Sequence, residues 1–130
     1  MTIAKPTGFK LMAILGIATE AFFLAVIPPI FFLAPEELSP IETGLLFFSI
    51  PVFIIAIFGC IQLLYKKILG LWVVRCTLCF SLLVEFICII EDLFTSNFDE
   101  VAFGIVGLFI NTAILTYWSS SRHGVYLRSE

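Results

Sequence analysis

Residues 44–90 read GLLFFSIPVFIIAIFGCIQLL (44–64), YKK (65–67) and ILGLWVVRCTLCFSLLVEFICII (68–90). Both long runs hold about the 20 mostly apolar residues that a helix needs to cross a bilayer. Only the short YKK segment separates them, so the two helices must be antiparallel neighbours. This stretch therefore predicts a membrane-spanning helical hairpin.

A comparable apolar run lies on each side of this hairpin, over about residues 11–33 and 101–118. Short connectors make each run antiparallel to the next one. We therefore expect an all-α fold, namely an integral membrane four-helix bundle made of two antiparallel hairpins. The whole chain, residues 1–130, would form one transmembrane domain, with residues 119–130 as a short tail.

The first run, residues 11–33, has a basic start like a signal peptide and two prolines near its end. Its basic start resembles that of a signal peptide, but the run is too long for one and contains Glu20, so we expect an uncleaved helix. Pro28 and Pro29 lie late in the run, and each removes a backbone hydrogen-bond donor. Either the helix bends at these prolines, or residues 28–40 leave the helix and lie along the membrane interface.

The composition excludes several classes of protein. Hydrophobic residues make up 61% of the chain and charged residues 13%, whereas soluble domains are about half apolar and about a quarter charged. The net charge of −3, without a basic cluster, does not favour nucleic acid as a partner. The lipid bilayer is the partner that this composition indicates.

Charges in the connecting segments fall into two groups. Basic residues precede the first run, separate the second from the third and follow the fourth: Lys5, Lys10, Lys66, Lys67, Arg122 and Arg128. The opposite connectors carry only acidic residues: Glu36, Glu37, Glu42, Glu91, Asp92, Asp99 and Glu100. The positive-inside rule then places both termini, including the 119–130 tail, on the cytoplasmic side of a cell membrane. A bacterial inner membrane is favoured because the chain has no N-x-[ST] glycosylation site.

Three polar residues, Glu20, Arg75 and Asn111, lie inside the apolar runs. The helical rise places Glu20 about 15 Å from Lys10 and Arg75 about 12 Å from the YKK segment. Asn111 lies about 10 Å from the end of the fourth run. We therefore expect an intramembrane polar cluster in which an acid, a base and an amide share one layer.

This cluster has three interpretations. Glu20 and Arg75 form an ion pair with Asn111 as an additional hydrogen-bonding partner, or the cluster binds a proton, an ion or a polar substrate. In the third interpretation, Arg75 extends towards the cytoplasm. A charged residue at mid-membrane costs about 3 kcal/mol, so the cluster is a functional hypothesis by default.

A second set of acidic residues lies further along the third run. Glu85 is about 27 Å from the YKK segment by the helical rise, close to the outer boundary. Glu91 and Asp92 would continue it as an acidic stripe that attracts cations or a basic partner. Such a stripe is also what an outward loop looks like when basic residues are excluded, and this second interpretation is favoured.

The four cysteines all lie in apolar runs, which favours free thiols that pack as small hydrophobic residues. Cys76 and Cys79 form a C-x-x-C pair, but no second pair accompanies it and His123 is the only histidine. We therefore expect neither a metal nor another cofactor. No catalytic motif is present, so an enzyme is not expected.

Four short apolar runs with a glutamate inside the first resemble, in outline, the small multidrug resistance exporters. That resemblance implies proton-coupled export by a dimer, with Glu20 as the shared proton and substrate site. The basic Arg75 in the same layer and the strong charge asymmetry of the loops depart from the family pattern.

Two functions are therefore compatible with the sequence. The first is an accessory or interaction subunit, which binds other membrane proteins or a second copy of itself within the membrane. The alternative is a small oligomeric transporter or channel that uses Glu20. The sequence favours the first because it reveals no continuous polar pathway.

Overall fold

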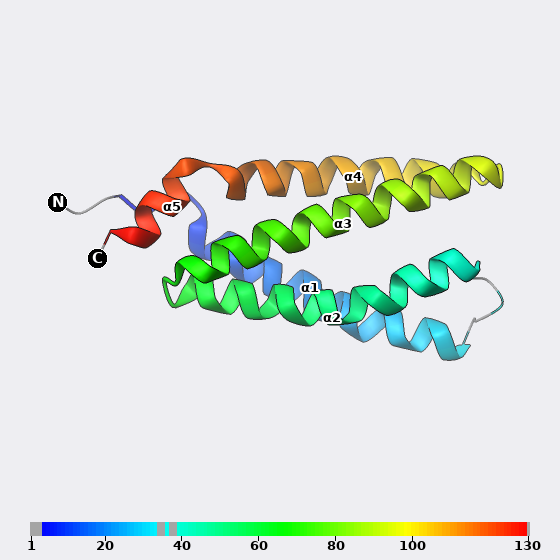
Figure 1. The fold of residues 1–130 in the computed structure, drawn as a ribbon, viewed down its shortest axis with the longest axis horizontal. Coiled ribbons are helices and arrows are strands. Elements are labelled where there is room, and N and C mark those ends of the chain that lie inside the picture. The colour runs from blue at the N-terminus through cyan, green and yellow to red at the C-terminus, as the bar shows by residue number, and fades with distance from the viewer. Residues whose placement is uncertain (1–3, 34–35, 37–38, 130) are drawn as a thin grey trace.

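The computed structural model describes residues 4–33, 36 and 39–129 (Figure 1). Their secondary structure consists of helices: α1 (Phe9–Leu33), α2 (Pro40–Leu64), α3 (Ile68–Phe94), α4 (Phe98–Ser119) and α5 (Ser121–Arg128). The first four are long and apolar enough to cross a membrane, as a multi-pass membrane protein requires. The expected all-α fold with four long apolar helices is confirmed.

The four long helices form a bundle of two antiparallel hairpins, as the sequence predicted (Figure 1). α1 packs along α2, α2 along α3, and α3 along α4. Within the described residues, α1 and α4 do not pack along each other, so the bundle has one open side. The start of α1, α5 and the α2–α3 turn lie at one end, which we call the termini end (Figure 1).

The boundaries of α2 have local causes. At its start, Ser39 Oγ accepts a hydrogen bond from the Glu42 N–H at 3.1 Å, and the Glu42 carboxylate accepts one from the Ser39 N–H at 3.3 Å. This capping box, followed by Pro40 in the first turn, fixes where the helix begins. At its end, the Lys67 N–H donates to Gln62 O across Lys66, whose φ is +61°. That pattern is a Schellman motif, which closes the helix before the turn.

The prolines of the first helix do not end it. α1 continues through Pro28 and Pro29 to Leu33, so the alternative in which residues 28–40 leave the helix is wrong for residues 28–33. The acidic residue Glu37, expected at the tip of this hairpin, lies outside the described residues.

Most of the expected tail after residue 118 forms the helix α5. α5 packs against α3, and it buries His123 and Leu127 among aromatic side chains of other helices. The centroid of the His123 ring lies 4.5 to 6.0 Å from the centroids of three aromatic rings, those of Phe9, Tyr117 and Trp118. α5 therefore covers the C-terminal end of α4, where Trp118 is only 2% exposed.

Burial of His123 makes the stability of this end depend on pH. Desolvation lowers the pKa of His123 below its ordinary 6.5, and the positive charge of Arg75 lowers it further, although the Ser120 carbonyl opposes the shift. The unfolded chain therefore takes up a proton first as the pH falls. His123 contributes fully to stability above about pH 6.5, and its contribution is lost as the pH drops below that value.

We expect His123→Gln to weaken the acid sensitivity of unfolding, because Gln has no proton to gain. Thermal unfolding of the purified chain at pH 7.5 and at pH 5 measures the difference for each protein. If the melting temperature fell equally between pH 7.5 and pH 5 in both proteins, the acid sensitivity would not come from His123.

Candidate functional site

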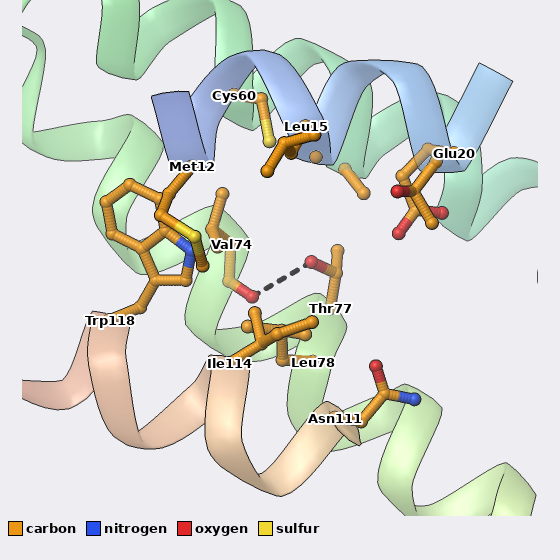
Figure 2. Close-up of a pocket in the computed structure, with 13 residues that line it drawn as sticks. Met12, Leu15, Glu20, Cys60, Val74, Thr77, Leu78, Asn111, Ile114 and Trp118 are labelled. Carbon is orange, nitrogen blue, oxygen red and sulfur yellow. Dashed lines mark hydrogen bonds between the residues drawn. The ribbon is translucent and has the colours of Figure 1, made fainter. Parts of the chain in front are cut away.

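A cavity of about 350 Å³ lies on the open side of the bundle, between α1 and α4, with α2 and α3 as its floor. Most of its lining is apolar: Met12, Leu15, Val74, Leu78, Ile114 and Trp118 contribute. Figure 2 shows Met12 and Trp118 at one end of the cavity and Glu20 and Asn111 at the other. Glu20 and Asn111 were expected in one layer from the sequence, and they line this cavity together.

Two further cavities follow this one towards the opposite end of the bundle. The second, of about 410 Å³, shares Glu20 and Asn111 with the first and is also lined by Glu85. The third, of about 550 Å³, shares Leu46 and Val84 with the second. Its lining includes the acidic residues Glu42, Asp92 and Glu100. The three cavities therefore form a series that ends among acidic side chains.

Close packing of α1 on α2 directs Glu20 into this space. A Cβ added at Gly16 would lie 2.7 Å from Cys60 Sγ, so any larger residue would displace the Cys60 side chain or separate the two helices. Glu20 follows Gly16 by four residues, about one helical turn, and lies on the same side of α1. Its Oε2 atom is buried and has no hydrogen-bond partner within the described part of the chain.

Asn111 is hydrogen-bonded to Glu85 rather than to Glu20. Its Nδ2 donates to Glu85 Oε1 at 2.8 Å. Gly107, one turn earlier on α4, makes room for this carboxylate, because an added Cβ there would lie 2.8 Å from Glu85 Oε1. The second oxygen, Glu85 Oε2, is buried and unpartnered among the residues that the structure describes.

The expected ion pair between Glu20 and Arg75 is not formed, although the structure describes both residues. Arg75 Nε instead donates to the Trp118 carbonyl at 2.8 Å, near the end of α4. Its guanidinium also lies over the Trp72 ring, 5.4 Å from the centroid. A cation at this point satisfies a helix-terminal carbonyl and complements the negative end of the α4 dipole. Arg75 therefore holds the end of α4, and Glu20 has no basic partner among the described residues.

We expect the effects of Glu20→Gln and Arg75→Met on the free energy of unfolding to be additive. Arg75→Met removes a charged hydrogen bond and should cost about 2 kcal/mol. The double variant should equal the sum of the single variants to within about 0.5 kcal/mol, as for sites without contact. Unfolding in detergent gives this free energy for the wild-type chain, the two single variants and the double variant. A coupling energy above about 1 kcal/mol between the two substitutions would contradict additivity and indicate an ion pair.

The expected acidic stripe of Glu85, Glu91 and Asp92 is divided in the structure. Glu85 lines the second cavity beside Asn111, whereas Asp92 lines the third. Glu91 lines neither, and its Oε2 is buried without a hydrogen-bond partner in the described ranges. The depth estimate failed because it took Trp118 as the membrane boundary, whereas Trp118 is bonded to Arg75 and covered by α5. Asn111 therefore lies further from the termini end than expected, at the level of Glu85 along the bundle.

The cysteines are free thiols in different environments. Cys60 is buried against Gly16, as expected, but Cys76 and Cys79 are exposed and Cys88 is half-buried. Among the described residues, no group of three or more His, Cys, Asp or Glu side chains is arranged to hold a metal ion.

Two carboxylates contribute buried oxygens without a hydrogen-bond partner to the first two cavities, within the described part of the chain. The hydroxyl groups of Ser49 and Thr77 donate to backbone carbonyls of their own helices, at 2.7 and 3.0 Å (the latter drawn in Figure 2). Glu20 and Glu85 each keep one free buried oxygen. A carboxylate in such apolar surroundings is stabilised either by a proton or by a bound cation. The site can therefore hold protons, or a cation whose apolar parts fill the cavity.

Comparison with known proteins found no matching family model, no matching curated protein and no matching solved structure.

Proposed function

We propose that the chain is a multi-pass protein of the cell membrane, in a bacterium the inner membrane, with the termini end in the cytoplasm. The six basic residues outside the apolar runs belong to segments at the termini end, as the positive-inside rule demands. Large apolar side chains such as Phe22, Phe103 and Phe109 are exposed around the bundle, where lipid would cover them.

Within this placement, we infer that the protein binds a lipophilic cation and exchanges it for protons. The observation that carries this proposal is the pair of free carboxylate oxygens, on Glu20 and Glu85, inside largely apolar cavities. A cation with apolar substituents would neutralise a carboxylate and bury its own hydrophobic surface against residues such as Leu15 and Ile114. Protons compete for the same oxygens, so uptake of one releases the other.

The series of cavities supports movement of this cation outwards. The first cavity lies at the open side between α1 and α4, and the third adjoins the acidic residues Glu42 and Asp92. A cation released from Glu20 would pass Glu85 before it reached these outer carboxylates. A single bundle encloses little space, so we propose that a second copy closes the open side during transport.

Trp118 provides a direct test because it lines the first cavity, and Trp72 is the only other tryptophan. In a Trp72→Phe protein, tetraphenylphosphonium should quench the fluorescence of Trp118 in a saturable manner, more weakly at low pH. The same cation should be expelled from vesicles when a proton gradient is imposed. Absence of saturable quenching at pH 8 would overturn the binding proposal, and binding without flux would overturn transport.

The open side of the bundle also favours the accessory-subunit function as a second candidate. α1 and α4 leave an apolar cavity between them, which a transmembrane helix of another protein would fill. A photoreactive amino acid in place of Leu15, which lines this cavity and is half exposed, distinguishes the two functions. Cross-links to a second copy favour the transporter, whereas cross-links to a different membrane protein favour the accessory subunit. Leu83, exposed on α3 and absent from the cavity lining, is the control position.

A further inference from the structure

A small basic cavity of about 270 Å³ lies at the termini end, away from Glu20 and Glu85. Three of the chain's seven basic residues line it, and no acidic residue does. The remainder of the lining is apolar or aromatic: Phe9, Leu63, Leu64 and Tyr126. The cavity therefore combines three lysine residues, Lys5, Lys10 and Lys66, with an apolar floor.

Three separate segments of the chain bring these lysines together. Lys66 occupies the positive-φ position of the α2–α3 turn, and its Nζ lies 4.7 Å from the centre of the Tyr126 ring on α5. The Tyr126 ring packs edge-on against Phe9 of α1, with centroids 5.2 Å apart. Both contacts hold the turn, α5 and the start of α1 around the same cavity.

The segment that carries Lys5 is attached to the bundle by a hydrogen bond. Tyr117 Oη on α4 donates to the Thr7 carbonyl at 2.8 Å. The next helical turn begins with the Phe9 N–H donating to Pro6 O at 3.2 Å, and it presents Lys10. The backbone segments that carry Lys5 and Lys10 are therefore attached to the bundle beside the turn that carries Lys66.

We propose that this cavity binds the phosphate headgroup of an anionic phospholipid from the cytoplasmic leaflet. Lysine ammonium groups are point-charge partners for phosphate, and basic pockets at this membrane level are typical headgroup sites. The apolar floor provides for the glycerol and the first acyl carbons, since Leu64 continues onto the exposed surface of α2. Free phosphate would gain nothing from that floor, which is why a lipid is the expected occupant.

This inference rests on the membrane placement proposed above, but not on cation binding at Glu20. Its test uses the purified full-length chain in phosphatidylcholine nanodiscs that contain increasing fractions of phosphatidylglycerol. Native mass spectrometry then counts the lipids that each chain retains. We expect the wild-type chain to retain phosphatidylglycerol in preference to phosphatidylcholine.

Substitution of the lysines should remove that preference. Each basic residue near an anionic headgroup contributes roughly fivefold to affinity, so Lys66→Gln should weaken retention about fivefold. The triple variant of Lys5, Lys10 and Lys66 to Gln should show no preference for phosphatidylglycerol. Lys67→Gln is the matched control, because Lys67 adjoins Lys66 in the turn but does not line the cavity.

Three outcomes would overturn the proposal. Equal losses in Lys67→Gln and Lys66→Gln would indicate general surface charge rather than a site. Displacement of the lipid by millimolar inorganic phosphate would indicate a phosphate site instead. An unchanged lipid preference in the triple variant, with helix content intact by circular dichroism, would exclude these lysines. A chain that does not insert into nanodiscs at all would contradict the membrane placement itself, so the two failures are distinguishable.

Discussion

Glu20→Gln should reduce the affinity for tetraphenylphosphonium by about 100-fold. The amide has nearly the shape of the carboxylate but no charge, so the cation would enter an apolar cavity without its counter-ion. Loss of one partner from a buried charge pair typically costs about 2 to 5 kcal/mol, and the lower part of that range corresponds to about 100-fold. The Trp118 fluorescence titration in the Trp72→Phe protein measures this affinity directly.

Glu91→Gln is the matched control for this prediction. Glu91 carries the same charge and also has a buried oxygen without a partner in the described residues, but it lines none of the three cavities. Its substitution should change the affinity less than twofold. Equal losses in the two variants would mean that the overall negative charge, rather than Glu20, attracts the cation. Glu85→Gln should give a smaller loss than Glu20→Gln, because Asn111 already contacts that carboxylate.

The helices and their pairing could be predicted from the sequence because they follow from hydrophobic length and short connectors. The spans of about 11–33, 44–64, 68–90 and 101–118 each fall within a helix of the structure. Lipid-crossing segments carry this information locally, since each must satisfy its own backbone hydrogen bonds. No contact between distant residues is needed to recognise them.

The hydrogen-bonding partners of the polar side chains inside the bundle could not be predicted, because they depend on the axial register of one helix against another. The depth estimate placed Arg75 beside Glu20, and the structure places it against the carbonyl of Trp118. An error of about two to three helical turns in the position of α4 along α3 was enough to exchange Arg75 for Glu85 in the layer of Asn111. Gly107 leaves the space that the Glu85 carboxylate occupies, and a single sequence does not reveal which neighbouring side chain fills such a space.

α5 was missed for a different reason. It has only eight residues, and its mostly polar sequence resembles a solvated tail. One signal was present: His123 and Leu127 are four residues apart, as on one face of a helix, and both are buried. That spacing alone is weak evidence, because two residues make a face only when another surface covers them. Here Phe9, Leu71 and Trp118 form part of that surface.

Gly70→Ala should destabilise the bundle more than any other single-methyl addition at a glycine. A Cβ at Gly70 would lie 2.5 Å from Gly59 O and 2.7 Å from the Leu63 backbone nitrogen. These atoms belong to the main chain of α2, so no side-chain rotation relieves the overlap, and α2 and α3 must separate. In lipid, such close approach of small residues is a principal source of helix association. We expect a loss of about 3 kcal/mol, the upper part of the range for overpacked cores.

Gly44→Ala provides the opposite result within the same chain. A Cβ at Gly44 meets no atom within 4 Å, and the residue lies inside α2, so alanine should stabilise the helix by about 0.5 to 1 kcal/mol. Unfolding in mixed detergent micelles, followed by circular dichroism, compares both variants with the wild-type chain. Similar stabilities for Gly70→Ala and Gly44→Ala would contradict the contact between Gly59 and Gly70.

Separation of α2 from α3 would also widen the floor of the first cavity, since Cys60 and Val74 line it from these two helices. Gly70→Ala should therefore weaken cation binding without altering any residue that touches the cation.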